Sequence, residues 1–202
     1  MKAMGTLIAV VVVVAVVVAA VMFLRRGAGS AVAATGSDPL LAQIEMKYPN
    51  GPVRRGSLGD DHPGAIKEIL IFDADDHWFF VFLGLRAVGQ PFELSLRTAK
   101  NAGESGPPDW PVEPATRVGD AVRDGMECAR GATWKLGAFS DEMPKSAGFL
   151  TLLDREFGEA TPDKLLQLVP VTQDEVSLTG DEKWALLGRL YKEKSRMIGE
   201  KL

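Results

Sequence analysis

The chain has 202 residues, which suffices for one domain with a sizeable core in addition to an apolar segment at the N-terminus. Its formal net charge of −4 argues against a nucleic-acid-binding protein, because phosphates call for clustered lysine and arginine. The single cysteine, Cys128, excludes a disulfide framework and a cysteine-based zinc site within one chain, and it favours a reducing compartment.

Residues 1–26 are predicted to form a transmembrane anchor. Residues 7–24 contain no charged side chain, amide or proline, and half of them are valine. In hydrocarbon a lone segment must satisfy its own backbone hydrogen bonds, so this run is expected to be helical. At about 1.5 Å per residue it spans roughly 27 Å, close to the roughly 30 Å of a bilayer core. Arg25 and Arg26 end it at the membrane surface.

Two alternatives to a retained anchor are a cleaved signal peptide and a buried core helix. Ala31-Val32-Ala33 matches a cleavage site, but the apolar run exceeds the roughly 7–15 residues of a signal peptide. A core helix would carry a polar face, which this run lacks. We therefore favour a single-pass protein of the cell membrane, and Arg25 and Arg26 indicate a cytoplasmic C-terminal domain. Residues 27–37, rich in Gly, Ala and Ser, are expected to be a flexible linker.

The remaining residues, 38–202, are predicted to form one α+β domain. Asp38 and Pro39 are typical of a helix start, and the turn of residues 49–52 is expected to end that helix. Three strands in an antiparallel meander are then expected, with a hairpin turn at residues 73–76, over residues 66–72, 78–85 and 92–98. The second is apolar almost throughout and should be covered on both faces. The third alternates apolar and polar residues, which predicts a half-buried strand.

A surface loop, a helix, short strands and a final helix are expected in the second half. The loop covers residues 101–111, and Pro114 opens a helix whose buried face would hold Ala115, Val118, Val122, Met126 and Ala129. That helix would contain Cys128. Strands are expected over residues 133–139, 148–153 and 165–169. Two T-x-x-E sequences, starting at Thr172 and Thr179, predict capping boxes. The last helix is expected to bury Trp184, Leu187 and Tyr191.

Three stretches of this domain resemble the suppressor-of-fused domain, which occurs in an animal signalling regulator and in many bacterial proteins. The first runs from His77-Trp78 through Gly84-Leu85 into Phe92-Glu93-Leu94-Ser95-Leu96-Arg97. The second follows a helix that ends at Gly131 and includes Phe149-Leu150-Thr151-Leu152-Leu153-Asp154. The third is Leu166-Gln167-Leu168-Val169-Pro170-Val171-Thr172-Gln173-Asp174-Glu175, followed by the Trp184 helix. In order and spacing the resemblance covers about residues 38–200.

The resemblance implies a suppressor-of-fused-like domain with a mainly antiparallel sheet, flanking helices and a protein-binding role. The animal member sequesters zinc-finger transcription factors, whereas bacterial members look like immunity proteins that bind and neutralise a cognate toxin. The membrane anchor fits the bacterial group better. A toxin domain is therefore the partner that the resemblance implies.

The densest group of potential metal ligands is Asp73, Asp75, Asp76 and His77, with Asp60, Asp61 and His62 upstream. Its spacing fits neither a calcium-binding loop nor a helical H-E-x-x-H zinc site. We therefore favour a solvated hairpin turn over a metal site. The chain also lacks the G-x-S-x-G, P-loop and G-x-G-x-x-G motifs, so neither a cofactor nor a catalytic residue is predicted.

Several residues are candidates for binding a protein partner. Trp110, in the proline-rich loop, is the best exposed aromatic anchor. Glu93 and Arg97 share one face of a strand; we favour pairing within the sheet, with contact to a partner as the alternative. Acidic loops would suit a basic partner, through Asp60, Asp61, Asp75 and Asp76.

The leading functional hypothesis is a membrane-anchored, non-enzymatic protein-binding module, immunity-like in its role, with residues 7–24 in the lipid bilayer. One alternative is a structural subunit of a membrane complex, in which the small residues Ala15, Ala19 and Ala20 allow close helix packing. A second is a metal-dependent hydrolase that uses the Asp/His loop.

Overall fold

The computed structural model describes residues 38–59, 63–100, 103–137, 145–154, 156–157 and 165–193. The chain divides into two units between Ser37 and Asp38, and all of these residues belong to the second. The anchor and linker predicted over residues 1–37 lie outside the described residues. None of the helices within the described ranges has the length and apolar character needed to cross a membrane.

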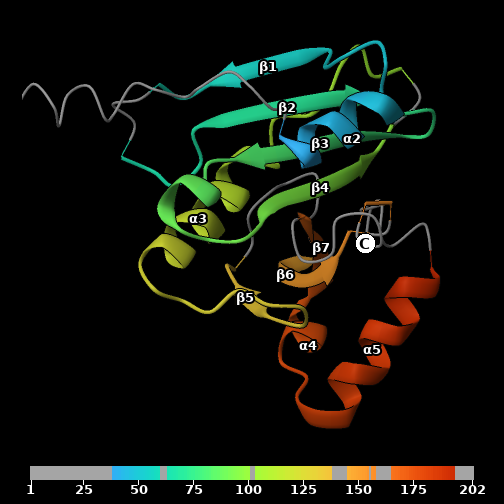
Figure 1. Cartoon of the computed structure of the whole chain (residues 1–202). Coiled ribbons are helices and arrows are strands. Elements are labelled where there is room, and N and C mark those ends of the chain that lie inside the picture. Colours follow the sequence, from blue (N-terminus) through green and yellow to red (C-terminus); the bar gives the residue numbers. More distant parts are fainter. Residues whose placement is uncertain are drawn as a thin grey trace, which may run out of the picture. The chain divides into compact units, whose positions relative to one another are not determined.

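A seven-stranded sheet forms the centre of the described part of the chain (Figure 1). Its order is β1-β2-β3-β4-β7-β6-β5, in which β4 and β7 are parallel and every other neighbouring pair is antiparallel. The predicted α+β class and antiparallel meander are therefore confirmed, whereas β1 was not predicted. The strands are β1 (Arg54–Ser57), β2 (Glu68–Asp73), β3 (His77–Leu83), β4 (Glu93–Ala99), β5 (Thr133–Lys135), β6 (Ser146–Leu153) and β7 (Leu165–Thr172).

Four α-helices and one 3-10 turn accompany the sheet in the described residues: α2 (Pro39–Lys47), η1 (Arg86–Val88), α3 (Val112–Arg123), α4 (Gln173–Val176) and α5 (Gly180–Lys192). The α2 helix begins as predicted, because the Asp38 carboxylate accepts a hydrogen bond from the Leu40 N–H at 3.0 Å. Figure 1 shows α2 lying across β2 and β3, and α5 near α4 at the other end of the sheet.

The two faces of the sheet carry different apolar clusters, because alternate side chains of a strand point to opposite faces. Phe72 and its partner Phe79 pack with Leu40 and Ile44 of α2. The neighbouring pair, Ile71 and Phe80, packs in a cluster that includes Ala115, Val118 and Val122 of α3. A third cluster joins Leu150, Leu152, Val169 and Val171 to Leu186, Leu187 and Leu190 of α5.

The prediction that β4 is half-buried was wrong. Its apolar residues, Leu94 and Leu96, face the α3 side as the alternation indicates. Its polar residues are nevertheless covered, and Glu93, Ser95 and Arg97 are at most 5% exposed. Alternation shows which residues share a face of the strand. It does not show that Asp154 and Glu156, which follow β6, cover the polar face of β4.

Both longer helices of the second half differ in detail from the prediction. The α3 helix ends at Arg123, and Gly125 has a φ of +99°, so Met126, Cys128 and Ala129 lie in the following loop. The capping box at Thr172 forms, whereas the Thr179 side chain makes no capping hydrogen bond. The α5 helix buries Leu186, Leu187 and Leu190 and leaves Trp184 58% and Tyr191 38% exposed.

Candidate functional site

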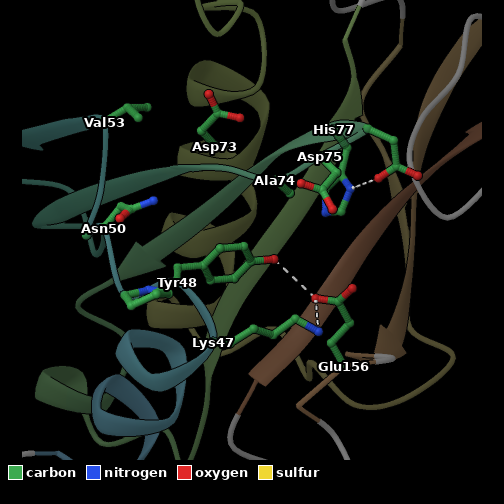
Figure 2. A pocket seen from close by; sticks show the side chains of 12 residues that line it. Lys47, Tyr48, Asn50, Val53, Asp73, Ala74, Asp75, His77 and Glu156 are labelled. Carbon is green, nitrogen blue, oxygen red and sulfur yellow. Dashed lines mark hydrogen bonds and ion pairs between the residues drawn. The ribbon is translucent and has the colours of Figure 1, made fainter.

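An acidic pocket of about 620 Å³ opens where the β2–β3 hairpin meets the end of α2 (Figure 2). The hairpin contributes the run from Asp73 to His77. The end of α2 contributes Lys47, and the chain that follows it contributes Tyr48 to Gly51 and Val53. Glu156, which follows β6, completes the wall. These residues together form the acidic pocket.

The hairpin holds its acidic side chains at the end of two well-packed strands. The N–H of Ala74 donates to the carbonyl of His77 at 3.1 Å and closes the turn. Lys100, which directly follows β4, makes an ion pair with Asp73 and donates to the carbonyl of Ala74. Its ammonium also lies 4.7 Å from the centroid of the Trp78 ring. The turn is therefore fixed from one side and exposes Asp75 and Asp76 on the other.

Tyr48 joins α2 to the opposite wall of the acidic pocket. Its ring stacks on Phe79, with 5.5 Å between centroids, and its hydroxyl donates to Glu156 at 3.2 Å. Lys47 lies 3.1 Å from the same carboxylate oxygen. Burial, together with the negative charge of Glu156, raises the pKa of the Tyr48 hydroxyl above its usual range, so this hydroxyl remains protonated and donates.

A buried polar network behind the acidic pocket positions Glu156. The Arg97 guanidinium contacts both carboxylate oxygens of Asp154, at 2.7 and 3.0 Å. Asp154 also accepts the Ser95 hydroxyl at 2.7 Å and the Glu156 N–H at 3.0 Å. Arg97 further contacts Gln167 at 3.0 Å and Glu156 at 3.3 Å. These contacts fix the backbone at Glu156 and so fix its carboxylate at the edge of the acidic pocket.

His77 is the buried polar residue of this pocket. Its side chain is 5% exposed, and its Nδ1 lies 2.7 Å from Asp76 Oδ1. Burial lowers the pKa of the His77 imidazole, and the charge of Arg97 lowers it further, against the opposing effect of Asp76. The ring is therefore neutral near pH 7. Its second nitrogen, Nε2, is buried and has no hydrogen-bond partner among the described residues.

The acidic pocket favours a cationic ligand. Its walls carry four carboxylates, from Asp73, Asp75, Asp76 and Glu156, against the one ammonium of Lys47. Asp73 and Glu156 already have cationic partners, whereas Asp75 makes no hydrogen bond or ion pair with the described residues. Across the described ranges, no group of three or more His, Cys, Asp or Glu side chains is arranged to hold a metal ion.

The predicted binding residues fall in different places. Asp75 and Asp76 line the acidic pocket, whereas Asp60 and Asp61 lie outside the described residues. Trp110 is half-buried and packs against the α3-side core. Arg97 belongs to the network behind the pocket, which agrees with the structural interpretation favoured from the sequence.

Glu93 is also buried, but its contacts are separate from those of Arg97. Its carboxylate accepts the N–H groups of Gly84, Leu85 and Arg86, at 3.0, 2.9 and 3.3 Å. It therefore closes the turn after β3. Neither Glu93 nor Arg97 is exposed enough to form a contact surface.

Sequence reasoning missed Lys47, Tyr48 and Glu156 as pocket residues. They lie in two segments more than a hundred residues apart, and only the packing of α2 and the return of the chain after β6 bring them together. The one available signal was the Asp154 carboxylate at the end of an apolar strand, because a buried carboxylate requires a cationic partner. Neither the scan against protein-family models nor the search of curated proteins finds a match for this chain.

Proposed function

We propose that this chain is a membrane-anchored protein-binding module that takes a basic segment of its partner in the acidic pocket. The observation that carries the proposal is the acidic pocket itself, with Asp75 and Asp76 exposed on a fixed turn. The anchor is residues 7–24, as the apolar run predicts. A suppressor-of-fused-like, immunity-like role supplies the partner class, which is a toxin domain.

The charge and shape of the acidic pocket support this proposal. A concave site lined by one sign of charge raises the local concentration of an oppositely charged group and speeds association. The volume of about 620 Å³ is within the usual range for a site that accepts a side chain or small ligand. No cofactor is needed for binding of this kind, and the function is that of a binding protein and not of an enzyme.

The test compares capture by the full chain and by a pocket variant. A C-terminally tagged chain is purified from native membranes as wild type, as Asp75→Asn and as Glu113→Gln, and bound proteins are identified by mass spectrometry. Glu113 is exposed on α3, which packs on the other face of the sheet, so Glu113→Gln removes the same charge away from the pocket. A protein recovered with wild type is then purified and its association rate is measured with all three chains.

The proposal predicts a partner whose association slows with Asp75→Asn and is unchanged with Glu113→Gln. Its dependence on salt should also weaken with Asp75→Asn, because fewer charges are screened. Equal association rates for all three chains would remove the acidic pocket from the interface.

A further inference from the structure

The hydrogen bond between His77 and Asp76 defines which imidazole nitrogen carries the proton. A carboxylate only accepts hydrogen bonds, so the Nδ1 atom, 2.7 Å from Asp76 Oδ1, carries the hydrogen. Because the ring is neutral, Nε2 then holds a lone pair and acts only as an acceptor. His77 Nε2 is therefore an acceptor, and Nδ1 is the donor.

This acceptor is unsatisfied. Nε2 is buried and makes no hydrogen bond with any described residue, although His77 lines the acidic pocket. Figure 2 shows the imidazole edge that carries Nε2 turned to the side on which Tyr48 and Glu156 lie. A buried acceptor without a partner is destabilising, so a ligand that donates to it gains a favourable contact.

The other polar groups of this wall already have partners. Glu156 accepts from Tyr48 and contacts Lys47 and Arg97. Asp73 is paired with Lys100. His77 Nε2 and the carboxylate of Asp75 make no hydrogen bond with the described residues, so both are open to an entering donor. A cationic group with an N–H fits both acceptors, because its charge suits the Asp75 carboxylate and its N–H can donate to Nε2.

We propose that the acidic pocket selects a cation that carries an N–H donor, such as the ammonium of a lysine side chain on the partner, and that this group donates to His77 Nε2. The inference rests on the proposed function and narrows the preferred ligand from any cation to a cation with an N–H donor. A cation whose nitrogen carries no hydrogen has the charge that Asp75 attracts, but it cannot donate a hydrogen bond to Nε2. The pocket should therefore distinguish lysine from fully methylated lysine.

Four small probes separate charge, size and hydrogen bonding. They are the amides of Nα-acetylated lysine, dimethyl-lysine, trimethyl-lysine and norleucine. Dimethyl-lysine keeps one N–H and most of the added bulk, trimethyl-lysine keeps the charge without a donor, and norleucine has neither. Each is titrated into the full ¹⁵N-labelled chain in detergent micelles, and the imidazole nitrogens of His77 are followed by NMR.

The proposal predicts that lysine and dimethyl-lysine bind and shift the Nε2 resonance, and that trimethyl-lysine binds at least about tenfold more weakly. Equal affinity for dimethyl- and trimethyl-lysine would overturn the selection for a donor and leave the acidic pocket intact as a cation site. Failure of every cationic probe to bind better than norleucine would instead overturn the proposed function.

A second measurement needs neither a ligand nor a variant. Long-range ¹H–¹⁵N correlations in the free protein near pH 7 report which nitrogen of His77 carries the proton. Protonation at Nδ1 with a bare Nε2 is the expected result. A proton on Nε2 would make that nitrogen a donor and would overturn the inference.

Discussion

The guanidinium of Arg97 grips the carboxylate of Asp154 with two hydrogen bonds, at 2.7 and 3.0 Å, and both side chains are at most 4% exposed. Arg97 also lies over the ring of Phe79, 4.4 Å from its centroid. Burial alone would raise the pKa of Asp154, but the Arg97 charge and hydrogen bonds hold that pKa below its usual value. The pair is ionised and joined by two hydrogen bonds, and it anchors the segment that carries Glu156 into the acidic pocket.

Removing one member of this pair should strongly destabilise the fold. We expect Arg97→Met to lower the free energy of unfolding by about 3–5 kcal/mol, because it leaves the Asp154 carboxylate buried without a cation. Chemical denaturation of the full chain in micelles measures this. The double variant Arg97→Met/Asp154→Leu should cost less than the sum of the single variants, because it leaves no uncompensated charge.

The matched control is the exposed pair between Arg54 and Asp109, whose nitrogen and oxygen also lie 2.7 Å apart. Solvent screens this contact, so Arg54→Met should change stability by less than about 1 kcal/mol. Similar losses for Arg54→Met and Arg97→Met would contradict the importance assigned to burial.

Glu93 should make stability depend on pH near neutrality. Burial raises the pKa of this carboxyl to about 7, against the opposing effect of the N–H groups of Leu85, Arg86 and Gly84. Between its ordinary pKa of 4.5 and about 7, the folded chain holds a proton that the unfolded chain has lost. Stability therefore falls as pH rises through this window.

The contribution of Glu93 is isolated by comparing denaturation curves of wild type and Glu93→Gln from pH 4.5 to 7.5. The glutamine cannot titrate, so the wild type should lose stability relative to the variant as pH rises. The comparison matters because Asp154 and Glu156, whose pKa values are lowered, contribute in the opposite direction at acid pH in both chains. A constant difference between the two curves would contradict the raised pKa.

Gly84 should not tolerate a side chain. Its φ of +137° disfavours other residues, and a Cβ atom would lie 2.2 Å from the carbonyl oxygen of Ala65. Gly84→Ala is therefore expected to lower the thermal midpoint by several degrees, as a loss of more than about 1 kcal/mol would. Gly89 has a φ of +92° with open space around its position, so Gly89→Ala should cost less. Equal losses of stability for the two variants would show that the backbone at Ala65 moves aside at little energetic cost.

Two apolar residues of α5 test which face of this helix packs against the sheet. Leu187 is 2% exposed and Trp184 is 58% exposed. We expect Leu187→Ala to cost about 2–5 kcal/mol, because it empties a packed site. Trp184→Ala, the larger truncation, should cost less, and its effect on unfolding would be read on the same denaturation curve. A larger loss of stability for Trp184→Ala than for Leu187→Ala would instead support the buried face predicted from the sequence, which included Trp184.

Local signals predicted much of the fold. The Asp38-Pro39 helix start, the hairpin at Asp73 to Asp76 and the capping box at Thr172 all depend on residues close in sequence. The buried face of α5 was predicted wrongly, because the apolar residues of this helix are compatible with two different faces. Packing against β6 and β7 selects the face with Leu186 over the one with Trp184. Propensity and spacing carry no information on that choice.

The candidate site was predicted only in part. Asp75 and Asp76 stood out because acidic residues in a turn are visible in the sequence, and their pocket could not be predicted because its other wall comes from Tyr48 and Glu156. Arg97 was recognised as a residue of the sheet, but its partner Asp154 lies 57 residues away and is brought there by the pairing of β6 with β7. Long-range contacts of this kind follow from topology, which a single sequence specifies only weakly.

The most direct test of the proposed function measures how fast the recovered partner associates with wild type and with Asp75→Asn, at low and at moderate salt. We expect the wild type to bind faster at low salt, and this advantage to shrink as salt screens the pocket. Glu113→Gln should follow the wild type at both salt concentrations. Association rates that are the same for wild type and Asp75→Asn at both would contradict the claim that the acidic pocket receives the partner.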